Sequence, residues 1–420
     1  MAEVSVSFPG PRAVRTRASR RSRRVLPAVL LALVLAGCGD FSAPPAAFTV
    51  QPSLSPIAPA PQDPATATPP VPDPSPSPSS SPGSSSAPSS SGQTPEPPTD
   101  PCAPTDEAVI ATCLSAPWGL APLPDGSALV GERTTGRILQ IARDTEPVEY
   151  ATVADVDASG TGGLLGLTLS PAFGEDHLIY AYVTTATDNR VLRIAAGEEP
   201  RAVFTGIPKG ATHNGGRLAF GGDGTLLVGT GDTGDAALAA DPASLAGKVL
   251  RLDEFGKPAA DNPTPGSPIL ARGFTDVIGA CVLADRTVAV LDRRTDADVL
   301  VVPAADRDYS TLASGDALWT FARADGGADD CAVDAGTLAT TSRDGQKLTG
   351  LAISASNGFS GTPTQLLDNR YGRLLTVVPD GTGLLWMTTS NRDGAGTPVP
   401  SDDRVVVLPS SPDGGGGGPD

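Results

Sequence analysis

The stretch from Asp223 to Asp232, DGTLLVGTGD, contains a tight Asp-Gly turn, an apolar run around Leu226 and a second glycine-rich turn. The same arrangement recurs in DGSALVGE, EDHLIYAYVTT, DRTVAVLD, AGTLATTSRDG and GTGLLWMTTSNRDG, around Leu129, Ile179, Val288, Leu338 and Leu384. The steps between successive runs are 50, 47, 62, 50 and 46 residues. Periods of about 50 residues with several short strands each are typical of β-propeller blades. We therefore predict an all-β fold, a six-bladed β-propeller over residues 106–410.

Two further runs indicate how such a ring closes. A strand near Val109 and a strand around Val405–Leu408 lie at the two ends of the repeat region. Pairing them removes the open sheet edges that invite aggregation. A single β-sandwich is the alternative fold, but about 300 residues with a regular period disfavour it.

The N-terminal residues predict export. Seven arginines between residues 12 and 24 precede an apolar stretch, Val25 to Ala36, which is too short to span a bilayer core of roughly 30 Å. The run Leu-Ala-Gly-Cys ending at Cys38 resembles the bacterial lipobox, which implies cleavage after residue 37 and a lipid on Cys38. An ordinary signal peptide with an incidental cysteine is the alternative. We expect the protein at the cell membrane, lipid-anchored on the extracytoplasmic face.

The composition between the leader and the repeats predicts a disordered linker. Residues 38–105 are rich in proline and serine with few large apolar side chains, so burial cannot offset the entropy of ordering them. The glycine-rich tail, residues 411–420, is expected to be flexible for the same reason.

The charge of the chain excludes one class of partner. The net charge of −17 becomes about −23 when the leader, with its seven arginines and one glutamate, is removed. So acidic a chain repels nucleic acid and anionic lipid headgroups, so that a lipid anchor alone would hold it at the membrane. We expect a monomer.

Four cysteines remain after Cys38, and an even number in an exported chain indicates disulfides. Three pairings are possible. We predict the near-neighbour pairs Cys102–Cys113 and Cys281–Cys331, the second bridging the fourth and fifth repeats. A metal site is the alternative, but the chain has no Cys-x-x-Cys spacing.

Several stretches resemble the soluble quinoprotein glucose/sorbosone dehydrogenase family. They are APWGLAPLPDGSALVGERTTGRILQI, GGLLGLTLSPAFGEDHLIYAYVTT, HNGGRLAFGGDGTLLVGTGDTGD, SLAGKVLRLDEFGKPAADNP and YGRLLTVVPDGTGLLWMTTSNRDG. The resemblance implies a six-bladed propeller that binds pyrroloquinoline quinone (PQQ) and calcium and oxidises a sugar hydroxyl. It also implies that His213 accepts the hydroxyl proton and that Asp232 orients its ring. A carboxylate on the far ring nitrogen fixes the imidazole tautomer and raises its basicity.

The same resemblance gives expectations for the surroundings of this pair. We expect a direct hydrogen bond between His213 and Asp232 at the mouth of the channel. The glycine pair after Asn214 is expected to leave room for a flat ligand. Arg217, Arg343 and Arg373 are expected to supply positive charge around an anionic ligand.

Other family motifs are replaced. Thr275 and Asp276 stand where the family has an Arg-Asn pair that contacts the quinone, and Leu375 stands for a second arginine. The run from Leu291 to Arg294 replaces a motif whose Gly and Pro carbonyls bind calcium, and the direction of Arg293 and Arg294 is open. Each lost charge-assisted hydrogen bond costs on the order of 1.5–3 kcal/mol, which predicts weak or absent PQQ binding.

Two functions follow. The first is a membrane-anchored, PQQ-dependent sugar or alcohol dehydrogenase. The second is a catalytically degenerate propeller that binds a sugar, an envelope glycan or a protein partner. A hydrolase is disfavoured because no Ser-His-Asp or paired-carboxylate motif is present.

Overall fold

The computed structural model describes residues 100–354 and 358–410. The predicted leader, Cys38, the linker up to residue 99 and the tail lie outside the described residues. In the part of the chain that is described, no helix has the length and apolar character needed to cross a membrane.

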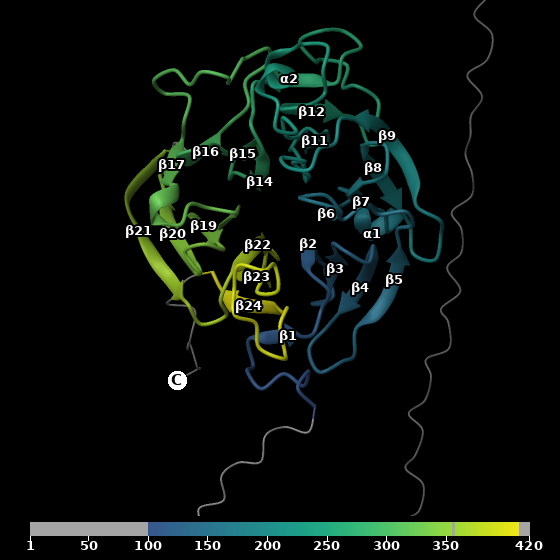
Figure 1. Cartoon of the computed structure of the whole chain (residues 1–420), viewed down its shortest axis with the longest axis vertical. Helices are drawn as coiled ribbons and strands as arrows, with labels where there is room; N and C mark the ends of the chain where they lie inside the picture. Colours follow the sequence, from purple (N-terminus) through teal and green to yellow (C-terminus); the bar gives the residue numbers. More distant parts are fainter. Residues whose placement is uncertain (1–99, 355–357, 411–420) are drawn as a thin grey trace, which may run out of the picture. The chain divides into compact units, whose positions relative to one another are not determined.

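The described residues form six four-stranded antiparallel sheets arranged radially as the blades of a propeller (Figure 1). The predicted six-bladed, all-β fold is confirmed. In each blade the first strand lies next to the central channel and the last lies at the rim (Figure 1). We number the blades 1 to 6 in chain order.

Blade 1 contains β2 (Pro117–Pro122), β3 (Ala128–Glu132), β4 (Arg137–Ile141) and β5 (Val148–Thr152). Blade 2 contains β6 (Leu164–Leu169), β7 (Ile179–Thr184), β8 (Asn189–Ile194) and β9 (Arg201–Ile207). Blade 3 contains β10 (Arg217–Phe220), β11 (Leu226–Gly229), β12 (Lys248–Leu252) and β13 (Ile269–Arg272).

Blade 4 contains β14 (Val277–Val282), β15 (Val288–Arg293), β16 (Ala297–Val301) and β17 (Trp319–Ala322). Blade 5 contains β18 (Asp330–Asp334), β19 (Thr337–Ser342), β20 (Lys347–Ile353) and β21 (Phe359–Asp368). Blade 6 contains β22 (Leu374–Pro379), β23 (Leu384–Thr389), β24 (Val405–Pro409) and β1 (Val109–Ala111). Short helical turns occur at α1 (Phe173–Asp176), α2 (Ala236–Ala240) and η1 (Arg323–Asp325).

The repeated apolar run is the second strand of each blade. Leu129, Ile179 and Leu226 lie on β3, β7 and β11, and each is fully buried between neighbouring sheets. The longest step, from Leu226 to Val288, is explained by α2 and by the long connection between β12 and β13. Turns end each strand after a few residues, so each apolar run forms one strand that spans its blade once.

The ring is closed by the two ends of the described chain. β1 pairs antiparallel with β24, with Val109 opposite Val406, and Val407 N–H donates to Ala108 O at 2.8 Å. This confirms the predicted closing strands. The outer strand of blade 6 therefore comes from the N-terminal side and its three other strands from the C-terminal side.

Both predicted disulfides are confirmed. Cys102 is bonded to Cys113, and the loop between them contains β1. Cys281 on β14 is bonded to Cys331 on β18, so this bridge joins the inner strands of blades 4 and 5.

Candidate functional site

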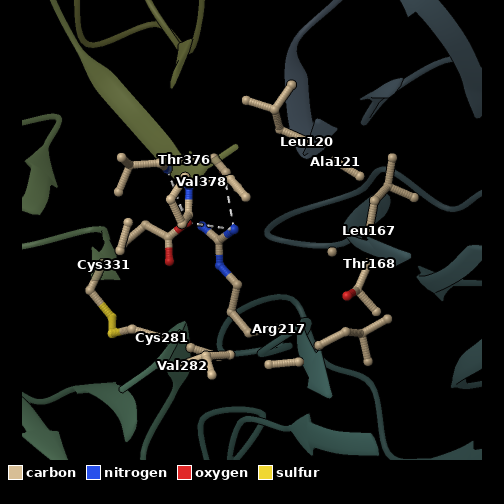
Figure 2. A pocket seen from close by; sticks show the side chains of 18 of the residues that line it. Leu120, Ala121, Leu167, Thr168, Arg217, Cys281, Val282, Cys331, Thr376 and Val378 are labelled. Atoms are coloured by element: carbon tan, nitrogen blue, oxygen red, sulfur yellow. Dashed lines mark hydrogen bonds and ion pairs between the residues drawn. A yellow bond between two sulfur atoms is a disulfide. The ribbon is translucent and has the colours of Figure 1, made fainter. Parts of the chain in front are cut away.

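The inner strands surround two cavities that occupy opposite ends of the channel. One, of about 290 Å³, lies at the ends of the inner strands and is largely apolar. Figure 2 shows Leu120, Leu167, Val282 and Val378 around it, with the Cys281–Cys331 disulfide on one wall. The other, of about 280 Å³, lies at the starts of the inner strands and is lined by charged side chains. We call these the apolar cavity and the charged cavity.

Arg217, the first residue of β10, lines both cavities and separates them. Its guanidinium stacks 3.9 Å from the centre of the Trp118 ring and lies 3.1 Å from Asp330. It also donates to Thr376 Oγ1 at 3.2 Å and to Ile278 O. Burial raises the pKa of Asp330 to about 6, although Arg217 opposes this shift. The arginine expected to contact a cofactor is thus already held by the protein.

The histidine and carboxylate pair is formed as expected. His213 Nδ1 lies 2.7 Å from Asp232 Oδ1, which also accepts from Gly234 N–H at 2.7 Å. His213 precedes β10 and Asp232 follows β11, so the hairpin of blade 3 brings them together. Because a carboxylate can only accept, Nδ1 carries the proton and Nε2 is left as a proton acceptor.

The pair lies beside the charged cavity. The next residues, Asn214 and Gly215, line that cavity, whereas His213 and Asp232 themselves do not. About a third of the His213 side chain is exposed, against 7% for Asp232. His213 is therefore accessible at the edge of the mouth, and Asp232 anchors it from below.

Gly215 lines the charged cavity, but the missing Cβ atoms of the glycine pair leave room for protein atoms. Gly215 has φ +66°, and a Cβ there would lie 2.6 Å from the Thr230 backbone. Gly216 has φ +115°, and its Cβ would meet the Leu165 side chain at 2.7 Å. Protein atoms fill the space in both cases, so the glycines allow close packing of β10 against its neighbours.

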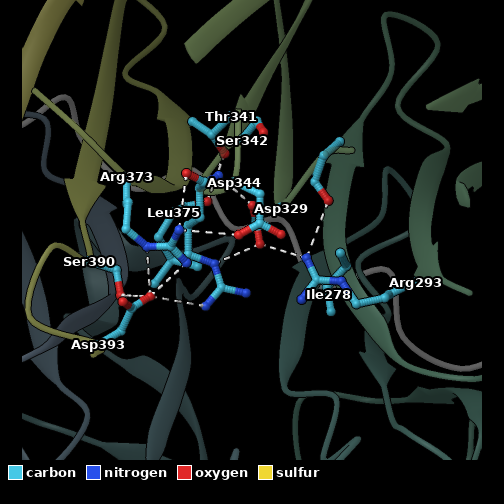
Figure 3. A network of polar contacts seen from close by, with 12 residues as sticks. Ile278, Arg293, Asp329, Thr341, Ser342, Asp344, Arg373, Leu375, Ser390 and Asp393 are labelled. Carbon is cyan, nitrogen blue, oxygen red and sulfur yellow. Dashed lines mark hydrogen bonds and ion pairs between the residues drawn. The ribbon is translucent and has the colours of Figure 1, made fainter. Parts of the chain in front are cut away.

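Arg343 and Arg373 belong to a network of arginines and aspartates (Figure 3). Arg343 lines the charged cavity, where its Nε lies 2.8 Å from Asp329 Oδ1. Arg373 is buried and does not line the cavity; it lies 2.9 Å from Asp393 and 3.2 Å from Asp344. Of the three arginines expected to surround a ligand, Arg217 and Arg343 face the cavity and Arg373 lies behind its wall.

Arg293 and Arg294 point to different places. Arg293 lines the charged cavity and lies 2.6 Å from the same Asp329 oxygen that Arg343 contacts. Arg294 does not line it: it contacts Asp292 at 2.8 Å and donates to Tyr309 O at 2.7 Å. Burial alone would raise the pKa of Asp329, but Arg343 and Arg293 outweigh burial and lower it. Asp329 therefore stays ionised between two arginines.

Asp276 brings a further carboxylate to the cavity. Its Oδ1 accepts from Gly215 N–H at 2.9 Å, and its own N–H donates to Asp292 Oδ1 at 2.9 Å. Thr275 N–H donates to the same Asp292 oxygen at 2.8 Å. Asp292 thus holds the Thr275–Asp276 turn, and burial raises the pKa of Asp276.

Sequence reasoning missed Arg133, Trp118, Asp329 and Asp393 as cavity residues. A usable signal exists for Asp329, because the run Asp329-Asp330-Cys331 directly precedes and begins an inner strand. Asp276, which directly precedes the inner strand of blade 4, reaches the same cavity. Arg133 lies at the turn after β3, and its NH1 donates to Gly162 O at 2.6 Å. No local pattern marks this contact.

This geometry defines a class of protein: a six-bladed propeller with a histidine–carboxylate pair beside a charged cavity at one mouth. Comparisons with known proteins agree with this class. Residues 114–286 match the family model described as Glucose / Sorbosone dehydrogenase. A solved structure of aldose sugar dehydrogenase from Streptomyces coelicolor in its PQQ-bound form is 37% identical. The match covers 72% of this chain and 96% of that one, with a TM-score of 0.68.

Two curated relatives match over a shorter stretch. Aldose sugar dehydrogenase YliI of Escherichia coli (strain K12) is 32% identical over 169 residues, 37% of this chain and 46% of the relative. Quinoprotein glucose dehydrogenase B of Acinetobacter calcoaceticus is 30% identical over 199 residues, 38% and 41% respectively. The chain thus aligns with less than half the length of either. The near-complete match to the solved structure establishes that the chain belongs to the glucose/sorbosone dehydrogenase family of soluble PQQ sugar dehydrogenases.

The residues present do not fit a calcium ion at the position that the family resemblance implies. Calcium takes about six to eight oxygen ligands, many of them carbonyls or carboxylates. Leu291 and Asp292 on β15 pair with both β14 and β16, and Arg293 pairs with β16, so their carbonyls lie within the sheet. Among residues 100–354 and 358–410, no three His, Cys, Asp or Glu side chains are grouped to hold a metal.

The residues present also do not fit a quinone with three carboxylates. Four arginines and three aspartates line the charged cavity, which leaves a formal surplus of one positive charge. Arg293 and Arg343 are held by Asp329, and Arg217 is held by Asp330. The fourth lining arginine, Arg133, has no carboxylate within ion-pair distance among the described residues. A trianion placed here would therefore meet one unpaired cation, too few to compensate the desolvation of three carboxylates.

Proposed function

We propose that this protein is a membrane-tethered sugar-binding propeller that has kept the proton-accepting pair of its family and no longer uses PQQ and calcium. The observation that carries the proposal is Asp329, which lies between Arg293 and Arg343 in the charged cavity. This carboxylate neutralises arginines that an anionic cofactor would require. The same cavity suits a polyhydroxylated ligand, because its wall presents hydrogen-bonding groups of both signs.

His213 supports the sugar class of ligand. Its Nε2 is an acceptor at the edge of the mouth, where it can take a hydrogen bond from a ligand hydroxyl. Asp232 fixes the ring orientation, so this acceptor is already in place before a ligand binds. Trp118 lines the same cavity, where the Arg217 guanidinium already stacks on its ring.

The names of the relatives favour the same substrate class. The relatives are named as acting on aldose sugars or glucose. We therefore propose a monosaccharide or the end of an envelope glycan as the ligand. The ligand would enter from the mouth that carries His213.

The tether is proposed from the sequence. A diacylated Cys38 and a proline- and serine-rich linker would hold the domain outside the membrane and let it reach envelope glycans. Mass spectrometry of detergent-extracted protein tests this: residues 1–37 should be missing and Cys38 should carry lipid. An intact leader or an unmodified Cys38 would contradict the tether.

A titration of the mature protein with PQQ and calcium tests the proposed loss of the cofactor. We expect no binding at high micromolar PQQ, followed by measurable binding of aldoses without it. The control is Asp329→Ala, which frees Arg293 and Arg343 and should raise affinity for the anionic quinone.

A PQQ-dependent dehydrogenase is the second candidate, favoured by the intact His213–Asp232 pair. Tight PQQ binding to the wild-type protein, with dye-coupled aldose oxidation that disappears in His213→Ala, would establish it and overturn the proposal.

A further inference from the structure

The charges around the charged cavity are unevenly paired. Arg217, Arg293 and Arg343 each lie within 3.1 Å of an aspartate, and Asp393 lies 2.9 Å from Arg373. Among the lining side chains, Asp276 is the aspartate with no ion pair to any residue that the structure describes. One negative charge thus faces the cavity without a cation bound to it.

Asp276 is well buried yet incompletely bonded. It is 7% exposed, and its Oδ1 accepts from Gly215 N–H. Within residues 100–354 and 358–410, no donor hydrogen-bonds to its Oδ2. That oxygen is not among the fully buried atoms without a partner, so it remains accessible from the cavity. Burial raises the pKa of Asp276, and Arg293 and His213 oppose that shift from a distance, but the Arg293 guanidinium is held by Asp329 and Asp298. An ionised carboxylate in so little solvent is costly unless a cation or further donors reach it.

The cavity also contains one arginine, Arg133, that is not paired with an aspartate in the described part of the chain. Arg133 has no carboxylate within ion-pair distance among the described residues; its NH1 donates to the carbonyls of Ala158, Gly160 and Gly162. Those contacts hold the guanidinium in place through one nitrogen. Its other N–H groups remain available to neutral oxygen atoms, such as ring hydroxyls.

We propose that the ligand of the charged cavity is an amino sugar, with its protonated amine bound to Asp276 and its ring hydroxyls bound by Arg133 and His213. This rests on the proposed sugar-binding function and names the class of sugar. An ammonium supplies the charge and the donors that Asp276 Oδ2 lacks. A neutral hydroxyl supplies one donor and no charge, and charge-assisted hydrogen bonds are roughly twice as strong as neutral ones.

Calorimetric titration of the mature protein with glucosamine, glucose and N-acetylglucosamine tests the proposal, at a pH where the free amine is protonated. The three sugars share a ring and differ at one carbon. We expect glucosamine to bind roughly tenfold or more tightly than the other two, in keeping with a hydrogen bond between charged groups.

Asp276→Asn removes the charge and keeps an acceptor for Gly215 N–H. It should abolish the preference for glucosamine and leave glucose affinity within about threefold. The matched control is Asp306→Asn, which removes one charge from an aspartate that is 78% exposed and lies outside the cavity. It should keep the preference. Thermal unfolding of each variant checks that the fold is retained.

The outcomes separate this inference from the proposed function. Equal affinity for all three sugars overturns the amino-sugar inference and leaves sugar binding standing. A preference that survives Asp276→Asn overturns the assignment to Asp276. Binding of none of the sugars overturns both the inference and the proposed function.

Discussion

Blade 3 and blades 4 and 5 contribute to one cavity but differ in how much of each the family model covers. The model matches residues 114–286, which include all of blade 3 and, at the start of blade 4, Asp276 and β14. Arg293 and Asp329, which also line the cavity, lie beyond the matched residues. Each blade is a separate sheet whose inner strand delivers its own residues to the channel. Residues of one blade can therefore differ without rearranging another blade.

The largest expected effect concerns the Cys281–Cys331 disulfide, which joins blades 4 and 5. The double variant Cys281→Ala/Cys331→Ala should lose about 4 kcal/mol of unfolding free energy, because the bridge closes a loop of 50 residues. The matched double variant Cys102→Ala/Cys113→Ala should lose less, about 3 kcal/mol, because its loop spans 11 residues. Urea unfolding without reductant measures both. A larger loss at the short bridge would reverse the expected order.

The next effect tests the charge network directly. Asp329→Asn leaves Arg293 and Arg343 without their shared anion and should cost about 3 kcal/mol, as for other broken buried pairs. Asp344→Asn removes a 58% exposed acid from the same network and should cost less than about 1 kcal/mol. Urea unfolding of the two variants distinguishes them. Similar costs would mean that Asp329 is not the centre of the network.

The unfolding free energy should also depend on pH through Asp292 on β15 of blade 4. Burial raises the pKa of Asp292 from 3.8 to about 6, so the folded protein holds this proton more tightly than the unfolded chain does. The contribution of Asp292 to the unfolding free energy should therefore fall as the pH rises from about 4 to 6. Asp292→Asn keeps the acceptor for Thr275 and Asp276 and should reduce that fall by on the order of 2 kcal/mol. A pH series of urea unfolding, with Asp306→Asn as the exposed control, checks the sign; an unchanged slope would contradict it.

The smallest effect separates two neighbouring arginines. Arg294→Ala should leave sugar affinity within about twofold, because the side chain contacts Asp292 and Tyr309 O outside the cavity. Arg293→Ala removes a cavity-lining charge and leaves Asp329 paired with Arg343 alone, so it should change sugar affinity more. Titrations of both variants with the same sugar measure the difference. Equal changes in sugar affinity for the two variants would contradict this expectation and would mean that lining the cavity is not what matters.

The sequence was informative wherever a pattern is local. The turn and apolar run around Leu226 indicated one strand per period, and the closing strands and both disulfides followed from the ends and spacing of the repeats. His213 and Asp232 could be paired because the hairpin between β10 and β11 brings them together. To predict their contact, it was enough to predict that the two strands form one hairpin.

The remaining site could not be predicted, because its contacts join different blades. Asp329 meets Arg293 across 36 residues, and neither side chain has a local pattern that names its partner. The directions of Arg293 and Arg294 depend on where β15 ends. The close approach of Thr230 and Leu165 to the glycine pair could not be predicted either, because these residues come from other strands and turns.

The disulfide between Cys102 and Cys113 also has a mechanical consequence. A pull on the chain before Cys102 reaches Cys113 through the sulfur atoms, and so bypasses the loop that contains β1. The load then passes to the hydrogen bonds that Cys113 and Leu114 N–H donate to Ser401 O and Asp403 O, and on to β2, the inner strand of blade 1. The pairing of β1 with β24 lies off this path. Tension on the chain before Cys102 would therefore act on these contacts before the seam that closes the ring.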